Sequence, residues 1–287
     1  MSQLYSIQST INYIKKELNT IYSSRETESI SYILLEHVLD YSRMQIQFSK
    51  TETLEQNTLE QVKNFVEELK TNKPIQYVLG EANFYELKFK VNEHTLIPRP
   101  ETEELVHAII NENKSTNLTI LDIGTGSGCI PICLAKNLNQ AKISTADISE
   151  KAIETAKENA KLNDVEISFY NRDILKWKDF NWEKYDIIVS NPPYVTEAEK
   201  EKMEDNVLKY EPHTALFVSD HDPLIFYRTI SELAISHLKK GGKLYFEINE
   251  SLGNEMKELL KEKGFTNILL HKDINGKNRM MSAIKTA

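Results

Sequence analysis

Thr119-Ile-Leu-Asp-Ile-Gly-Thr-Gly-Ser-Gly128 joins an apolar run to three alternating glycines, and residues 130–138 continue as an apolar helix pattern. The apolar run indicates a buried strand. Gly124, Gly126 and Gly128 let the chain turn sharply and let a ligand approach the backbone. A strand, a glycine-rich turn and a helix in this order are typical of the ligand-binding edge of an α/β sheet.

The spacing of these glycines argues against two common kinds of ligand-binding loop. Gly-x-Gly-x-Gly differs from the Gly-x-Gly-x-x-Gly pattern of dinucleotide-binding folds. A phosphate-binding loop would carry Lys before Ser or Thr, and here Cys129 follows the last glycine. Cys129 and Cys133 are interpreted as small buried hydrophobic residues, because no further Cys or His completes a ligand set, and no metal site is predicted.

An acidic residue ends the next predicted strand, Lys142–Asp147. At a strand end, Asp147 can accept hydrogen bonds from both hydroxyls of a ribose. It could instead cap the helix that opens at Ser149. We include Thr125, Ser127 and the three glycines of the loop in the same predicted nucleoside site, together with Ile148 and Asn191.

A second acid, Asp173, follows the third predicted strand, residues 166–171. It is placed to accept from the amino group of adenine, and the alternative is that it caps the next turn. Its neighbour Ile174 is predicted to be an apolar wall for the base.

Asn191-Pro192-Pro193-Tyr194 follows a fourth buried strand, Tyr185–Ser190. Two consecutive prolines remove two backbone donors, so the carbonyls at Asn191 and Pro192 stay free. The Asn191 amide oxygen and the Pro192 carbonyl can accept both hydrogens of a planar amino group, and the Tyr194 ring can cover its face. The four residues are therefore predicted to bind the acceptor substrate. A turn that merely ends the strand is the other interpretation.

Composition limits the class of protein. The chain has 287 residues, 35 basic and 43 acidic, and a net charge of −8. This acidic balance argues against stable binding to nucleic acid. No apolar run reaches the roughly 20 residues of a membrane span, and no signal peptide is recognisable at the start, so we expect a cytoplasmic protein.

Residues 1–72 carry only helical patterns. The first helix has apolar residues at three- and four-residue spacing: Leu4, Ile7, Ile11, Ile14, Leu18 and Ile21. A capping box at Ser23 and Glu26 opens the second helix, and a similar pattern at Thr58 and Gln61 predicts the start of the third. The core face of the second helix is predicted to hold Ile30, Ile33, Leu34 and Val38. Three amphipathic helices can form a small bundle.

From residue 84 onward the pattern changes to strands. Residues 84–91 alternate as in a half-buried strand, which predicts a hairpin in the linker. After residue 119 strands and helices alternate, which indicates a parallel sheet with helices on both faces. Further strands are predicted at 242–248, 268–271 and 280–284. The tight-turn pair Asn275-Gly276 predicts that the last strand returns antiparallel.

The order of these motifs resembles the class I methyltransferases that use S-adenosylmethionine. Leu96-Ile-Pro-Arg-Pro-Glu-Thr-Glu103, Pro74-Ile-Gln-Tyr-Val-Leu-Gly80 and Tyr210-Glu-Pro-His-Thr-Ala-Leu216 make the chain similar to the release-factor glutamine methyltransferases, the HemK/PrmC family. The resemblance covers about residues 74–284. Within it, Arg99, Glu101 and Thr102 belong to a family motif. They either start a helix or lie near the methionine end of the cofactor.

The resemblance implies a seven-stranded, mostly parallel Rossmann-like sheet and S-adenosyl-L-methionine as cofactor. The implied reaction is methyl transfer to the glutamine amide of the Gly-Gly-Gln tip of peptide chain release factors. Asn191, Pro192 and Tyr194 would act by positioning the nitrogen rather than as a base. The implied domains are a helical substrate-recognition domain (1–72), a hairpin linker (73–98) and a catalytic domain (99–287), in a monomer.

Other functions remain open from the residues alone. The same chemistry suits an exocyclic amino group of DNA or RNA, or a glutamine of a ribosomal protein. A nicotinamide oxidoreductase is disfavoured by the loop spacing. A non-catalytic binding module with this fold is disfavoured by the intact Asn191 and Tyr194.

Overall fold

The computed structural model describes residues 5–286, and the chain forms two compact units. One unit comprises the residues up to Gly80 together with Glu204–Tyr210, and the other comprises Glu81–Met203 and the residues from Glu211 onward. Each unit is built around its own buried apolar clusters. None of the helices within residues 5–286 is both long and apolar enough to cross a membrane.

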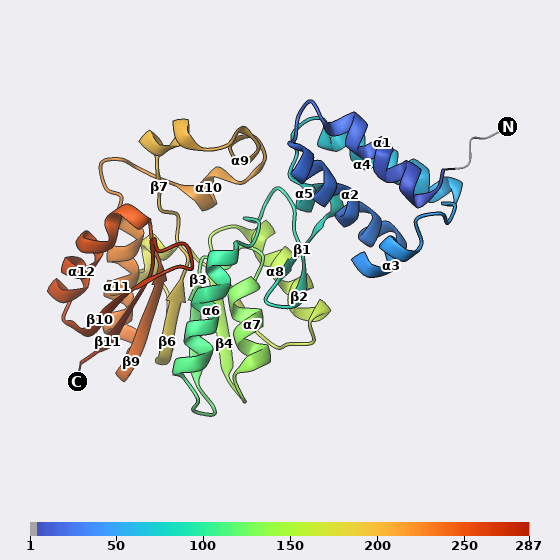
Figure 1. The fold of residues 1–287 in the computed structure, drawn as a ribbon. Helices are drawn as coiled ribbons and strands as arrows, with labels where there is room; N and C mark the ends of the chain where they lie inside the picture. The colour runs from blue at the N-terminus through green and yellow to red at the C-terminus, as the bar shows by residue number, and fades with distance from the viewer. Residues whose placement is uncertain (1–4, 287) are drawn as a thin grey trace. The chain divides into compact units, whose positions relative to one another are not determined.

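The regular elements among the described residues of the first unit are helices. Its helices are α1 (Ile7–Leu18), α2 (Ser24–Leu39), α3 (Arg43–Phe48), α4 (Gln56–Leu69), α5 (Ile75–Leu79) and α9 (Asp205–Tyr210) (Figure 1). Ile14 and Leu18 of α1, Leu34 of α2 and Val66 of α4 are buried in one cluster. The late segment joins this unit through Tyr210, whose hydroxyl donates to the Thr71 carbonyl at 2.9 Å.

The helix starts test the capping predictions. Ser23 and Glu26 form the expected reciprocal capping box. The box predicted at Thr58 is wrong, because α4 already begins at Gln56 and Thr58 lies in its first turn. Buried Leu54 and Leu59 bracket this start at the two positions of a hydrophobic staple, so apolar burial sets the boundary.

The predicted apolar stripes are slightly too wide. Ile33 was assigned to the core of α2, and it is 38% exposed. Ile21 lies past the end of α1 and is 40% exposed, whereas Leu4 lies outside the described residues. The positions between Ile7 and Leu18 are buried as expected. The error at Ile33 lies in the width of the apolar stripe, because Ile33 is in the middle of α2, whereas Ile21 lies beyond the end of its helix.

A two-stranded hairpin opens the second unit. Its strands are β1 (Glu81–Phe84) and β2 (Leu87–Lys90), antiparallel, with Phe84 opposite Leu87. The hairpin is confirmed, but the single strand predicted over residues 84–91 is wrong. Tyr85 and Glu86 have positive φ and form the two-residue turn. The alternation of apolar and polar residues runs through this turn without a break. The turn contains neither Gly nor Asn, the residues that normally mark a two-residue hairpin turn.

A seven-stranded sheet forms the centre of the second unit. Its strands are β3 (Thr119–Ile123), β4 (Lys142–Asp147), β5 (Ser168–Asn171), β6 (Tyr185–Ser190), β9 (Leu238–Glu247), β10 (Phe265–Lys272) and β11 (Asn278–Lys285). They lie in the order β10-β11-β9-β6-β3-β4-β5, and β11 runs antiparallel to both of its neighbours, whereas the other neighbouring pairs are parallel. The predicted sheet and the antiparallel return of the last strand are confirmed.

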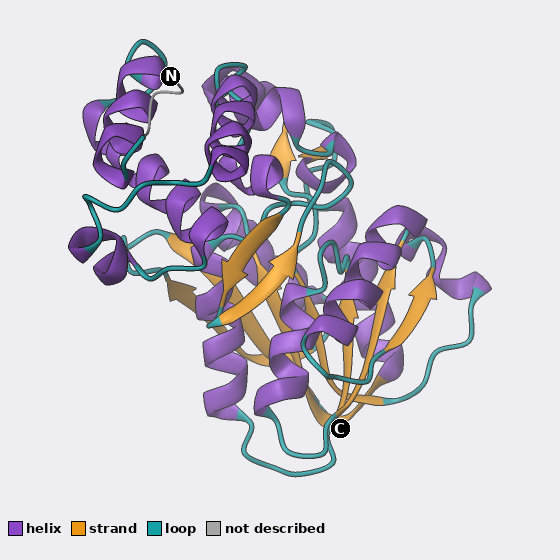
Figure 2. Ribbon diagram, turned by 90° about the vertical axis from the view of Figure 1, so that its right-hand side faces the viewer, coloured by secondary structure: helices purple, strands orange, loops and turns teal. Residues whose placement is uncertain are grey.

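Helices cover both faces of this sheet, as Figure 2 shows in purple on either side of the orange strands. The remaining elements are α6 (Pro100–Glu112), α7 (Cys129–Asn137), α8 (Glu150–Leu162), η1 (Ile174–Asp179), β7 (Val195–Thr196), η2 (Glu197–Lys202), α10 (His213–Leu216), β8 (Phe217–Val218), α11 (Ile225–His237), η3 (Glu250–Leu252) and α12 (Gly253–Glu262). Helices α6 and α7 contribute to one core cluster, and α11 and α12 to the other.

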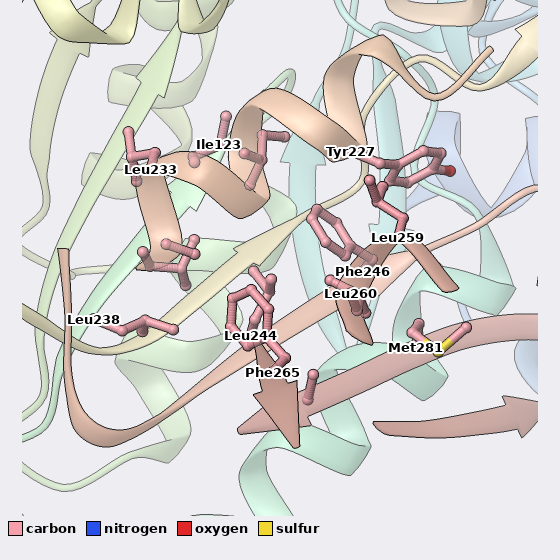
Figure 3. Packing of buried hydrophobic residues seen from close by; sticks show 14 of the residues in the cluster. Ile123, Tyr227, Leu233, Leu238, Leu244, Phe246, Leu259, Leu260, Phe265 and Met281 are labelled. Atoms are coloured by element: carbon pink, nitrogen blue, oxygen red, sulfur yellow. The ribbon is translucent and has the colours of Figure 1, made fainter. Parts of the chain in front are cut away.

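The strands are buried on both faces, which explains their near-continuous apolar sequence. In β6, Ile187 and Val189 belong to the cluster under α6 and α7, whereas Ile188 belongs to the opposite cluster. Figure 3 shows this second cluster, in which Phe246 and Tyr227 pack edge to face with ring centroids 5.2 Å apart. Central strands of this kind make the edge of the sheet a rigid base for a site.

The carboxyl ends of four strands meet at one edge. Ile123 of β3 is in register with Ala146 of β4 on one side and with Ser190 of β6 on the other. The order in which strands are added to the sheet reverses at β3. Strands β4 and β5 lie to one side of β3, and β6 lies to the other. Ligands of open α/β sheets bind at such a switch point.

Candidate functional site

A cavity of about 380 Å³ opens at this switch point. Its size falls within the range of small-molecule sites. Among the described residues, its wall contains nearly all of the predicted site: Gly124, Thr125, Gly126, Ser127, Asp147, Ile148, Asp173, Ile174, Asn191, Pro192 and Pro193. Gly128 and Tyr194 are the two predicted residues that are not part of this wall. Arg99, Thr102 and Phe217 also line it.

The glycine loop leaves β3 with left-handed backbone at each glycine. Gly124, Gly126 and Gly128 have φ of 80°, 53° and 83°. A side chain at Gly126 would meet no protein atom within 4 Å, so the space beside it is open. Gly128 differs, because a side chain there would lie 3.0 Å from Ile132 and 3.1 Å from Ala156. Gly126 therefore leaves room for a ligand, whereas Gly128 lets α7 pack closely against α8.

Asp147 ends β4 and faces the glycine loop. Its Oδ2 accepts from the Gly126 N–H at 3.0 Å, and its Oδ1 accepts from the Ser149 N–H at 2.9 Å. Burial raises the pKa of Asp147, while these backbone hydrogen bonds oppose the rise. Ser149 itself caps α8, through the Ala152 N–H. Each carboxylate oxygen accepts one bond in this arrangement and retains capacity for another, as ribose binding requires.

The segment after β5 carries Asp173 and an aromatic cluster. Asp173 Oδ1 accepts from the Leu175 N–H at 2.9 Å and caps η1, which is the alternative role considered for it. The Arg172 guanidinium lies 4.2 Å from the Tyr170 ring centroid and 4.6 Å from that of Trp182. Stacking of this kind holds the segment in place. Asp173, Ile174 and Leu175 thereby form one wall of the cavity.

Asn191 and Pro192 lie at the end of β6, beside the glycine loop. The Asn191 carbonyl would be 3.7 Å from a side-chain carbon placed on Gly124. Asn191 Nδ2 donates to Thr102 Oγ1 at 3.3 Å. Ser190, the last residue of the strand, donates its hydroxyl to the Ile123 carbonyl at 2.6 Å and ties β6 to β3. The structure thus brings the predicted nucleoside and acceptor residues into one cavity.

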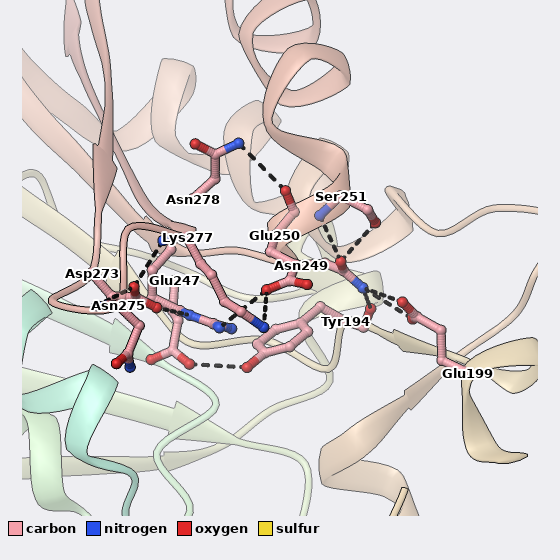
Figure 4. Close-up of polar contacts among 11 residues, drawn as sticks. Tyr194, Glu199, Glu247, Asn249, Glu250, Ser251, Asp273, Asn275, Lys277 and Asn278 are labelled. Carbon is pink, nitrogen blue, oxygen red and sulfur yellow. Dashed lines mark hydrogen bonds and ion pairs between the residues drawn. The ribbon is translucent and has the colours of Figure 1, made fainter. Parts of the chain in front are cut away.

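Tyr194 lies behind this wall and is held at both ends. Its hydroxyl donates to Glu247 Oε1 at 3.0 Å, and its carbonyl accepts from Asn249 Nδ2 at 3.1 Å (Figure 4). Burial and the neighbouring Glu247 raise the pKa of Tyr194 far above its usual range, so the hydroxyl stays protonated. Its ring packs against the core cluster that contains Tyr227 and Phe246.

Glu247 is a site residue that sequence reasoning missed. It ends β9, is 1% exposed, and accepts from Thr102 Oγ1 at 2.6 Å as well as from Tyr194. Burial raises the pKa of Glu247, whereas these two hydrogen bonds and the charge of Arg279 lower it. The signal was available, because an acid inside the apolar run Leu244–Ile248 is unusual in a buried strand.

Arg99 is also fixed by a partner from a distant motif. Its Nη2 donates to Glu211 Oε1 at 2.6 Å, and the Glu211 side chain is 1% exposed. Glu211 Oε2 accepts from the Ile97 N–H at 3.3 Å. The two residues belong to separate sequence motifs, residues 96–103 and 210–216, and nothing in either motif indicates the pairing. The pair anchors the loop before α6, which carries Pro98 and Arg99 into the cavity wall.

The donor and acceptor set fits a nucleoside on one side and a planar amino group on the other. Asp147 offers carboxylate oxygens, Gly126 offers open space beside the backbone, and Ile148 and Ile174 offer apolar contacts. Asn191 and Pro192 offer amide and carbonyl groups in the same cavity. No part of this arrangement needs a strong base, because positioned polar groups can orient a nitrogen and stabilise developing charge.

Comparisons with known proteins found two matching family domains and several similar proteins. Residues 9–80 match the family described as PrmC N-terminal domain, and residues 101–212 match the Methyltransferase small domain. A protein of Flavobacterium psychrophilum named release factor glutamine methyltransferase is 52% identical, over 92% of this chain and 94% of that protein. A protein of the same name from Bacteroides thetaiotaomicron is 44% identical, over 94% and 97% of the two chains.

Solved structures with lower identity share the fold. A methyltransferase of Pyrococcus furiosus is similar with a TM-score of 0.54 and 20% identity, over 78% of this chain and 100% of that one. The 16S rRNA N2 G1207 methyltransferase of T. thermophilus, in complex with AdoMet and guanosine, has a TM-score of 0.51 and 18% identity. That likeness covers 71% of this chain and 49% of the other.

Proposed function

The chain belongs to the release factor glutamine methyltransferase family, and on this premise we propose its reaction. It transfers a methyl group from S-adenosyl-L-methionine to the side-chain amide nitrogen of the glutamine in the Gly-Gly-Gln tip of peptide chain release factors. The observation that carries the proposal is the single cavity in which Asn191 and Pro192 lie beside the glycine loop and Asp147. A nucleoside cofactor and an amide acceptor can meet there.

The nucleoside part of the site is proposed to hold the cofactor. Asp147 would accept the ribose hydroxyls with the lone pairs that Gly126 and Ser149 leave free. Ile148, Ile174 and Asp173 would contact the adenine, and the backbone from Gly124 to Gly128 would give the cofactor a close approach to the chain. When bound, the cofactor supplies an electrophilic methyl group on a sulfonium.

Asn191 and Pro192 are proposed to hold the acceptor. An amide nitrogen is a weak nucleophile, because its lone pair is delocalised into the carbonyl. The Asn191 amide oxygen and the Pro192 carbonyl each accept one N–H, and this restricts the nitrogen to the orientation in which its lone pair faces the methyl carbon. Both oxygens bind more strongly as positive charge grows on nitrogen, and the methylated nitrogen then loses a proton to water. Pro193 would complete the acceptor wall, and Tyr194 would support it from behind.

The helical unit is proposed to recognise the substrate protein. A three-residue tip offers little area, so specificity needs a second contact on the release factor. The proposed division is a recognition domain over residues 1–72, a linker with the hairpin over 73–98 and a catalytic domain over 99–287. One chain supplies all residues assigned to cofactor and acceptor, so a monomer is the proposed active form. The proposed compartment is the cytoplasm, where release factors act.

Labelled methyl transfer tests the reaction. Purified release factor, the same protein with the tip glutamine replaced by alanine, bulk DNA and ribosomes are each incubated with enzyme and labelled S-adenosylmethionine. The expected result is label on the intact release factor alone. Label on DNA or ribosomes instead would overturn the assigned substrate.

A peptide comparison tests the recognition domain. A short Gly-Gly-Gln peptide and the whole release factor are compared as substrates. The whole protein should have a much lower KM at a similar kcat, because the helical unit contacts it away from the tip. Equal KM values would contradict the recognition role.

A further inference from the structure

A chain of hydrogen bonds behind the cavity wall ends at Asn191. Glu247, at the carboxyl end of β9, accepts from Thr102 Oγ1 at 2.6 Å. Thr102, in the first turn of α6, accepts from Asn191 Nδ2 at 3.3 Å. Thr102 and Glu247 are 2% and 1% exposed, so water has little access to compete for these bonds. The three residues come from three separate elements and meet only in the folded chain.

The direction of each bond in this chain follows from the chemistry of its ends. A carboxylate only accepts hydrogen bonds, so the single Thr102 proton must point to Glu247. The Thr102 oxygen can then only accept, and the group of Asn191 that faces it must be the NH2. The amide oxygen of Asn191 is left on the other side. Within residues 5–286 no donor bonds that oxygen, and Asn191 lines the cavity.

We propose, resting on the function given above, that Glu247 acting through Thr102 is the positioning residue that turns the Asn191 amide oxygen toward the acceptor. A cavity that presents an acceptor oxygen binds a group with N–H donors. It rejects a carboxylate, which has only acceptors. Glu247 and Thr102 thereby make the site select a glutamine amide over a glutamate carboxylate.

Contacts of the same carboxylate with the Asn191–Tyr194 segment support this role. Its second oxygen accepts from the Tyr194 hydroxyl at 3.0 Å, as Figure 4 shows. Two residues further along the chain, Asn249 donates to the Tyr194 carbonyl at 3.1 Å. The end of β9 therefore holds the first and the last residue of the segment, the first of them through Thr102. A buried site that leaves its amide free to rotate would lose discrimination between the two acceptor groups.

The test combines turnover with a choice between two tips. Thr102→Val and Glu247→Gln are assayed for kcat on release factor, and for inhibition by a release factor whose tip glutamine is replaced by glutamate. Each variant should lower kcat on the order of 100-fold, as small errors of orientation do. Each should also bind the glutamate tip more tightly, relative to the glutamine tip, than the wild type does. Thr102→Ser keeps the hydroxyl and should rescue much of both losses.

Thr155→Val is the matched control. Thr155 is a buried helical threonine outside the cavity wall, and its hydroxyl accepts from Asn92 Nδ2 at 3.0 Å. The substitution removes a comparable hydrogen bond, so it should lower the Tm without changing kcat or the tip preference. Binding of S-adenosylhomocysteine to every variant checks that the nucleoside part is intact.

Two results would overturn the inference while leaving the proposed reaction in place. One is full kcat and an unchanged preference in Thr102→Val and Glu247→Gln. The other is a lower kcat with the preference for the glutamine tip unchanged, which would make these residues merely structural. If the wild-type protein methylates no release factor, the proposed function fails first and the inference falls with it.

Discussion

The two sides of the cavity are built in different ways. The nucleoside side comprises the glycine loop, Asp147 and Asp173, and each of these lies at the end of its own strand or within two residues of it. The acceptor side comprises Asn191, Pro192, Thr102 and Glu247. Its key bonds join Asn191 to Thr102 and Thr102 to Glu247, across long stretches of the chain.

This difference separates local from long-range determinants. On the nucleoside side, the functional residues are positioned mainly by hydrogen bonds to main-chain groups nearby in the sequence. For example, the Ser149 N–H donates to Asp147. On the acceptor side, the buried carboxylate of Glu247 from a distant strand accepts from Thr102 in the wall and from Tyr194 behind it. We expect substitutions on the nucleoside side to change cofactor affinity, and those on the acceptor side to change turnover.

The largest expected effect is that of Asn191→Ala. It removes an acceptor for the amide hydrogens, and loss of one such group costs on the order of 100- to 1,000-fold in kcat. Affinity for S-adenosylhomocysteine, measured by calorimetry, should stay close to that of the wild type. Equal turnover of variant and wild type would remove Asn191 from the mechanism. Loss of cofactor binding instead would erase the distinction between the two sides.

Asp147→Ala should have the opposite signature. Loss of a charged hydrogen-bonding partner weakens cofactor binding by about 1.5–3 kcal/mol, or roughly 10- to 150-fold in Kd. At saturating cofactor, kcat should be nearly restored. Glu150→Ala is the control, because it removes the same charge from the exposed first turn of α8. An unchanged Kd for Asp147→Ala would exclude it from the ribose site.

Two buried acids contrast in how their oxygens are satisfied. Each oxygen of Glu247 accepts a hydrogen bond from a hydroxyl group. In Asp122 of β3, Oδ2 accepts a hydrogen bond from Thr145 Oγ1 at 2.7 Å. Burial raises the pKa of Asp122 to about 7. Between about pH 4 and pH 7, Asp122 is therefore protonated in the folded protein and ionised in the unfolded chain. As the pH rises through this range, the contribution of Asp122 to the free energy of unfolding falls progressively.

Asp122→Asn should remove this pH dependence. Relative to wild type, the variant should gain about 2 kcal/mol in unfolding free energy between pH 5 and pH 8, measured by urea denaturation. The gain should level off above pH 7, where Asp122 has lost its proton in the folded state as well. An identical pH profile for the two proteins would contradict the raised pKa.

The smallest expected effect distinguishes two glycines of one loop. Gly126→Ala and Gly128→Ala each place a side chain on a residue with positive φ, which strains the backbone. Gly128→Ala also adds contacts of 3.0 Å to Ile132 and 3.1 Å to Ala156. Gly128→Ala should be less stable than Gly126→Ala by on the order of 1 kcal/mol, the lower end of overpacking costs. Gly126→Ala should instead weaken cofactor binding more than Gly128→Ala does. The reverse order of Tm values would reassign the two glycines.

Much of the fold could be predicted because its signals are local. The apolar runs at residues 119–123 and 185–190 became β3 and β6, and Asn275-Gly276 lies in the turn before the antiparallel β11. The predictions failed where a boundary depends on packing rather than on a motif. The start of α4 and the turn at Tyr85 and Glu86 are the two clear cases.

Local patterns were enough to predict the α/β order, the glycine loop, and the placement of Asp147 and Asn191 at strand ends, because periodicity and turn chemistry act over a few neighbouring residues. The long-range contacts could not be predicted in this way: Asn191 donates to Thr102, Glu247 accepts from both Thr102 and Tyr194, and Glu211 pairs with Arg99. Buried polar groups need partners, and the order of strands in the sheet determines which distant groups are near enough to provide them.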